Sequence, residues 1–166
     1  MEDGNEISQR NLGLSYKDGD GIKKDFKKAY YWFRKALENG NEKAIGNLAD
    51  CYYYGREIKR NFKKAVLFYK KLADKKDPDA QLSLGVCYYN GTGVRRNYKK
   101  AVYWYRKAIK QGEDQAMYNL GLCYLDGDGV EENEETGIQW IKKATKAGDE
   151  YAKRKLKKLK RRKTNK

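Results

Sequence analysis

The chain has 166 residues, a formal net charge of +15 at pH 7 and no histidine. The lack of histidine removes the usual general base and metal ligand, and it excludes every Ser-His or Cys-His nucleophilic site. No run approaches the length of a membrane span, and the polar start, MEDGNEISQR, predicts no secretory signal.

A period of 36 residues organises the chain. The linkers YKDGDGI, YYYGREI, YYNGTGV and YLDGDGV begin at residues 16, 52, 88 and 124, and such a period indicates a repeat architecture. Amphipathic patterns on both sides of each linker predict two helices per repeat. In chain order, the predicted helices span residues 5–18, 25–39, 42–54, 61–75, 78–90, 97–110, 113–126, 133–147 and 149–162.

The third repeat illustrates the pattern. Ala80, Leu84 and Tyr88 follow one another at every fourth position, so they share one face of a helix. Asn97 is a preferred N-cap residue for the second helix. Gly112 stands where a left-handed C-terminal stop is expected.

The linker glycines predict tight turns between helices, because glycine adopts the required backbone angles without strain. A calcium loop is the alternative for YLDGDGVEENEE, but it needs an oxygen ligand and then a glycine where the chain has Val130 and Glu131. A phosphate-binding loop would follow a strand rather than a helix. We therefore predict no metal, no cofactor and no catalytic residues.

The pattern Ala-x-x-x-Leu-Gly-x-x-Tyr-x-x-Gly-x-Gly-Val, followed by Asn-x-x-x-Ala-x-x-Trp-Tyr-x-x-Ala, resembles the Sel-one-like repeat, a relative of the tetratricopeptide repeat. The resemblance implies an all-α right-handed αα superhelix, a solenoid whose first helices line a concave groove. It also implies a non-catalytic adaptor or scaffold. The second repeat departs from the pattern, with Ala49, Glu57 and Lys76 in place of glycines.

The same resemblance sets the predicted domain organisation. Four helix-turn-helix repeats occupy residues 5–40, 41–76, 77–112 and 113–148, and a basic capping helix and tail occupy 149–166. Residues 1–4 form an N-terminal tail.

Cys51, Cys87 and Cys123 also lie 36 residues apart. Equivalent positions in stacked repeats are separated by about 10 Å, beyond the ~7 Å limit for a disulfide. We therefore expect three buried, reduced thiols that react slowly. Reduced thiols favour a cytoplasmic protein, with a nuclear location as the alternative in a eukaryote.

Asparagine recurs before the repeat leucine, at Asn11, Asn47 and Asn119. Because asparagine is a poor residue inside a helix, its side chain is expected either to hold a partner peptide in the groove or to bond a neighbouring repeat. Helical geometry predicts further groove residues: Arg10, Lys43, Asp50, Tyr53, Tyr89 and Tyr118. Arg10 and Lys43 favour an acidic partner.

The formal charge of the four repeats is +3, +6, +5 and −5, followed by +8 for residues 149–166. The basic tail includes Lys157, Lys158, Lys160, Arg161, Arg162 and Lys163. Such a run is typical of a nucleic-acid or anionic-surface patch, or of a solvated cap. We predict a monomeric protein that binds a protein or peptide partner, with nucleic-acid binding through the basic edges and tail as the alternative.

Overall fold

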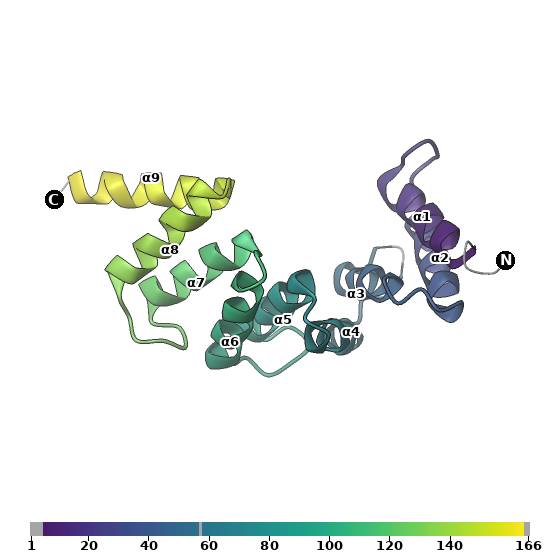
Figure 1. Ribbon diagram of the computed structural model, residues 1–166, viewed down its shortest axis with the longest axis horizontal. Helices are drawn as coiled ribbons and strands as arrows, with labels where there is room; N and C mark the ends of the chain where they lie inside the picture. The colour runs from purple at the N-terminus through teal and green to yellow at the C-terminus, as the bar shows by residue number, and fades with distance from the viewer. Residues whose placement is uncertain (1–4, 57, 165–166) are drawn as a thin grey trace. The chain divides into compact units, whose positions relative to one another are not determined.

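The computed structural model describes residues 5–56 and 58–164 (Figure 1). Over these residues the chain forms nine α-helices and no strand. They are α1 (Asn5–Asp18), α2 (Phe26–Glu38), α3 (Ala44–Tyr54), α4 (Phe62–Asp74), α5 (Pro78–Asn90), α6 (Tyr98–Ile109), α7 (Asp114–Asp126), α8 (Glu134–Lys146) and α9 (Glu150–Thr164). Each predicted helix is confirmed to within two residues at either end. The predicted N-terminal tail, 1–4, lies outside the described residues.

The contacts divide the chain into two units, residues 1–72 and 73–166. In the first unit α1 packs against α2, and α2 packs against α3. In the second unit each helix from α5 to α9 packs against the next one along the chain (Figure 1). Each unit is therefore built from contacts between helices that are neighbours in sequence.

The helix ends follow the predicted chemistry. Asn97 and Asn133 cap α6 and α8, where their side chains accept hydrogen bonds from backbone amides of the first turn. First helices end on left-handed glycines, Gly55, Gly91 and Gly127. Second helices are followed by left-handed residues too: Gly40, Lys76, Gly112 and Gly148. Lys76 keeps the turn, with φ +67°, although it lacks the conformational freedom of glycine. Glu57 lies outside the described residues.

Each repeat closes its helix pair over one large side chain from the second helix. The repeat leucines Leu48, Leu84 and Leu120 are also buried. In the third repeat a Cβ atom added to Gly85 would lie 2.6 Å from the Tyr105 ring. In the second repeat Ala49 is buried at the glycine position.

The large side chain of the second repeat, Tyr69, differs in one contact. Its hydroxyl donates a 2.7 Å hydrogen bond to the carboxylate of Asp50, on α3. In three repeats the small residue of the first helix is glycine, and its large partner is Phe33, Tyr105 or Ile141. In the second repeat the small residue is Ala49 and the large one is Tyr69.

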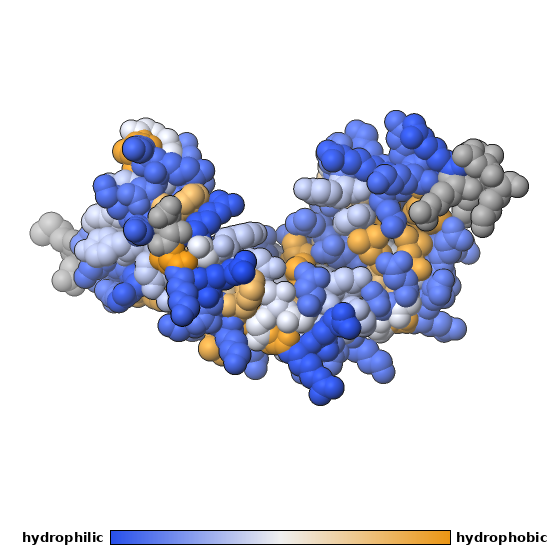
Figure 2. All heavy atoms as spheres, turned by 180° about the vertical axis from the view of Figure 1, so that it is seen from behind, coloured by the Kyte–Doolittle hydropathy of each residue, from blue (hydrophilic) through white to orange (hydrophobic). Residues whose placement is uncertain are grey.

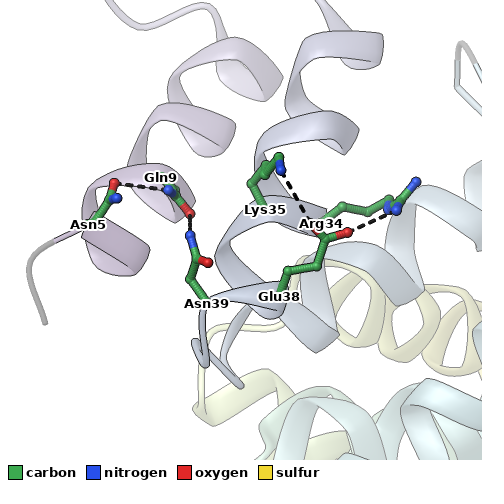
Figure 3. A network of polar contacts seen from close by, with 6 residues as sticks. All are labelled: Asn5, Gln9, Arg34, Lys35, Glu38 and Asn39. Atoms are coloured by element: carbon green, nitrogen blue, oxygen red, sulfur yellow. Dashed lines mark hydrogen bonds and ion pairs between the residues drawn. The ribbon is translucent and has the colours of Figure 1, made fainter. Parts of the chain in front are cut away.

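Buried glutamines tie the first helix of two repeats to the chain that follows the second helix. Gln9 accepts a 2.9 Å hydrogen bond from the Asn39 side chain and donates to Asn5 (Figure 3). Gln81, which is 1% exposed, accepts a 2.8 Å hydrogen bond from Gln111 and donates to the Ala73 carbonyl. These bonds satisfy polar groups that would otherwise be costly to bury.

The fourth linker packs against the third repeat. The Tyr89 hydroxyl donates a 2.7 Å hydrogen bond to Asp128 of that linker. Next to it, a Cβ atom added to Gly129 would lie 2.6 Å from the Tyr98 carbonyl oxygen at the start of α6. At the matching place in the first linker, Gly21 has no atom within 4 Å of such a Cβ. The same sequence motif thus serves as a free turn in one repeat and as a packing surface in another.

Hydrophilic residues cover most of the face shown in Figure 2, and hydrophobic residues appear there in small patches. This agrees with a mean hydropathy of −1.07 and a high content of charged residues. No helix of the described residues is long and apolar enough to cross a membrane.

Candidate functional site

A cavity of about 310 Å³ lies in the first unit, between the end of α1, the linker after it, and α3. It is lined by Lys17, Asp18, Lys24, Phe26, Asn47, Asp50, Cys51, Tyr54 and Arg56. Two of these, Asn47 and Asp50, are groove residues predicted from the sequence. The structure brings them to one cavity because they lie three positions apart on α3 and so share a face.

Tyr54 and Arg56 also line this cavity but were not predicted from the sequence. Tyr54 follows Asn47 by seven positions, which is two helical turns, so helical spacing could have found it. Its ring is 59% exposed. The Arg56 guanidinium lies over both the Tyr54 ring, at 5.3 Å, and the Phe26 ring, at 5.1 Å. No spacing rule predicts Arg56, because it lies in the linker.

The oxygen and the nitrogen of the Asn47 side-chain amide have different roles. Its side-chain oxygen accepts a 3.0 Å hydrogen bond from Nε of Arg10, on α1. Among the described residues its amide nitrogen makes no hydrogen bond, and the side chain lines the cavity. One end of the amide therefore links two repeats, and the other end is available to a bound group.

The remaining predicted groove residues of this unit lie elsewhere. Tyr53 packs against the rings of Tyr54, Phe62 and Tyr69, with centroids 5.2, 5.4 and 6.2 Å away, so its ring is in contact with α4. Asn11 is exposed on α1, and Lys43 is exposed immediately before α3. Neither lines the cavity described above.

In the second unit the predicted residues are held by separate contacts. Tyr89 binds Asp128 and packs against Tyr98, with ring centroids 5.1 Å apart. Burial, and then the bond to Asp128, raises the pKa of Tyr89, so it remains a protonated donor. Tyr118 packs against the cluster around Ile141, and burial raises its pKa. Asn119 is half-buried.

The basic tail forms the polar face of α9. Leu156 and Leu159 pack against the cluster of Ile141, Ala144 and Ala152, so one stripe of the helix caps α8. Four of the predicted basic residues are exposed: Lys157, Lys158, Lys160 and Arg161. The side chains of Arg162 and Lys163 lie outside the described residues.

The cysteines correct one expectation. All three thiols are free, and Cys87 and Cys123 are buried as predicted, but Cys51 is only half-buried. It is more accessible because it borders the cavity between the first linker and α3. No cluster of three or more His, Cys, Asp or Glu residues able to hold a metal occurs within the described part of the chain.

We expect Cys51 to react first with a thiol reagent in the native protein. Burial, then the Asp50 carboxylate, raises the pKa of Cys51 to about 11, and burial raises the pKa of Cys87 to about 11. Burial also raises the pKa of Cys123, to about 12. Since the thiolate is the reactive form, each labelling rate should rise with pH up to the pKa of its thiol. Mass spectrometry of labelled peptides, with and without denaturant, measures the order. Equal native rates for Cys51 and Cys123 would contradict it.

The four repeats match a known protein family. The family model of the Sel1 repeat matches residues 7–41, 43–77, 78–113 and 114–149. The comparison with curated protein sequences gives no significant match.

Solved structures share the fold. A protective antigen of uropathogenic Escherichia coli with an SLR fold is 36% identical, with a TM-score of 0.81 over 91% of this chain and 32% of its own. A Sel1 repeat protein from Oxalobacter formigenes is 31% identical, with a TM-score of 0.84 over 93% of this chain and 63% of its own. Cysteine-rich protein B of Helicobacter pylori is 27% identical, with a TM-score of 0.56 over 81% of this chain and 96% of its own.

This chain spans less than two thirds of the length of the first two relatives. Sel1 repeat proteins generally mediate protein–protein interactions and are typically non-enzymatic scaffolds. With four matched repeats and an all-α structure in helix pairs, the chain belongs to the Sel1 repeat family.

Proposed function

We propose that the protein is a non-catalytic adaptor and that the cavity of the first unit binds an extended segment of a partner protein. The observation that carries this proposal is the gathering of Asn47, Asp50 and the exposed Tyr54 ring around one cavity. An extended peptide offers alternating donors and acceptors, which an amide and a carboxylate can meet. An exposed aromatic ring adds apolar contact area of the kind that dominates binding energy at interfaces.

Charge favours an acidic segment. Three basic side chains, Lys17, Lys24 and Arg56, line the cavity with two acidic ones. One acidic residue, Asp50, already accepts a hydrogen bond from Tyr69, which holds its carboxylate in place. The lining therefore keeps a positive balance that attracts a negatively charged segment and raises its association rate.

Asn47→Ala is expected to weaken binding by about 1 kcal/mol, roughly fivefold, because the bound segment loses a hydrogen-bond partner. The probes are peptides selected on the wild-type protein from a random display library, and the measurement is their affinity beside thermal stability. Asn11→Ala is the matched control, since Asn11 holds the same repeat position but does not line the cavity.

Two outcomes would contradict this assignment. If Asn47→Ala lowers stability sharply while the affinity per folded molecule is unchanged, Asn47 serves only to link α1 and α3 through Arg10. If Asn11→Ala weakens binding as much as Asn47→Ala, the partner does not depend on this cavity.

A further inference from the structure

A second cavity, of about 530 Å³, lies in the other unit, at the linker between α5 and α6. It is lined by Tyr88, Val94, Arg95, Arg96, Asn97 and Lys100. No carboxylate is among these residues. The three basic side chains are all exposed. This cavity was not predicted as a site from the sequence.

The positive charges of this cavity are uncompensated. Among the described residues, Arg95, Arg96 and Lys100 form no ion pair. The Lys100 ammonium lies over the Tyr88 ring at 5.3 Å, and the Arg96 guanidinium lies over the Tyr98 ring at 5.4 Å. Three like charges around one hollow repel one another, so an anion bound between them would lower the free energy.

The fold does not require these basic residues. In the fourth repeat the matching positions are Glu131, Glu132 and Thr136. The backbone there is nearly the same: Asn97 has φ −155° and ψ 97°, and Asn133 has φ −153° and ψ 98°. The backbone N–H of each of these two N-cap residues also donates a 2.8 Å hydrogen bond to the backbone carbonyl of the repeat tyrosine, Tyr88 or Tyr124. The same backbone conformation thus accommodates either basic or acidic side chains. The fold alone therefore does not explain why the third repeat has basic ones.

Basic residues occupy the matching positions in the first and second repeats as well. The second repeat has Lys59, Arg60 and Lys64 at these positions, and Lys64 lies over the Tyr52 ring at 5.2 Å. The first repeat has Lys23, Lys24 and Lys28, with Lys28 over Tyr16 at 5.2 Å. Three repeats therefore share a stacked lysine beside a basic pair, and the third repeat has two arginines in that pair.

We propose that the cavity of Arg95, Arg96 and Lys100 binds the phosphate group of a phosphorylated side chain on a partner protein. A phosphorylated side chain carries about −1.5 to −2 charges at pH 7, so it balances three cations better than a single carboxylate group would. Arginine also binds phosphate oxygens through two parallel N–H donors. Nucleic acid is less suited, because stacked bases need open ring faces. Here Lys100 covers Tyr88, and Tyr98 contacts both Arg96 and Tyr89.

The test uses two labelled peptide libraries with degenerate flanks, one with a central phosphoserine and one with serine. We expect the full chain to bind the phosphorylated library about tenfold more tightly by fluorescence anisotropy. Arg95→Glu/Arg96→Glu should remove this preference and still fold, because the fourth repeat folds with Glu131 and Glu132. Lys157→Glu/Lys158→Glu makes the same change in formal charge on α9 and should keep the preference.

Three results would overturn the proposal. The first is equal binding of the two libraries by the wild-type protein. The second is loss of the preference in the α9 variant but not in the cavity variant. The third is a single-stranded RNA that binds more tightly than the phosphopeptides and depends on Arg95 and Arg96, which would assign the cavity to nucleic acid. If the double glutamate variant unfolds, the neutral Arg95→Gln/Arg96→Gln variant replaces it.

Discussion

Gly129→Ala should lower the free energy of unfolding by about 3 kcal/mol, because the new methyl group would combine backbone strain with a steric clash. Gly129 has φ +77°, a conformation that disfavours any residue with a Cβ atom. The Cβ would also approach the backbone of Tyr98 and Lys99, which cannot move aside as a flexible side chain can. Denaturant unfolding monitored by circular dichroism measures the loss.

Gly21→Ala is the matched control. Gly21 has φ +71° and occupies the same linker position, but nothing lies within 4 Å of its added Cβ. Its substitution should therefore cost about 1 kcal/mol, the backbone strain alone. The difference between the two variants measures how firmly the fourth linker packs on the third repeat. Equal losses would show that this packing contributes nothing to stability.

Phe33→Ala should cost about 4 kcal/mol, the usual scale for removing a fully buried aromatic ring. The ring is 0% exposed and packs with Ala29 and Leu48 in the core of the first unit. The Gly13 backbone approaches it so closely that an added Cβ would lie 2.6 Å away. The surroundings can therefore fill only part of the cavity that the ring would leave. Thermal and denaturant unfolding give the loss.

Tyr31→Ala supplies the control from the same helix. The Tyr31 ring is 52% exposed and contacts Trp32 edge-on, with centroids 5.2 Å apart. Its loss should cost no more than about 1 kcal/mol. If both variants lose the same stability, the core described for the first repeat does not govern its unfolding.

The helices could be predicted because the 36-residue period repeats both hydrophobic faces and end signals. Leu48, Leu84 and Leu120 keep one register and are buried, and Asn97 and Asn133 cap as their residue type predicts. Helical spacing also placed Asn47 and Asp50 on one face. These properties depend only on residues close together in the chain.

Contacts between residues far apart in the chain could not be predicted. The period gives no distance between Arg10 and Asn47, which are 37 positions apart, so their hydrogen bond appears only in the structure. The exposure of Cys51 depends on where the first linker lies, and the sequence treats it as equivalent to Cys87 and Cys123. The cavity around Arg95 and Arg96 is lined by residues close together in the chain, but it depends on the path of the linker between α5 and α6, which the repeat pattern does not predict.

The pairing of a small residue with a large one inside each repeat has an evolutionary consequence. Gly85 touches the Tyr105 ring, whereas Ala49 faces the core of a repeat in which Tyr69 is bonded to Asp50. Tyrosine is the large partner in both repeats, so the cost of an added methyl group at the small position depends on the contacts that hold the ring, such as the bond to Asp50. Epistasis is therefore expected between the small position and the residue that bonds the tyrosine. A consensus repeat built by averaging each position separately would risk combining an alanine with a tyrosine that lacks this bond.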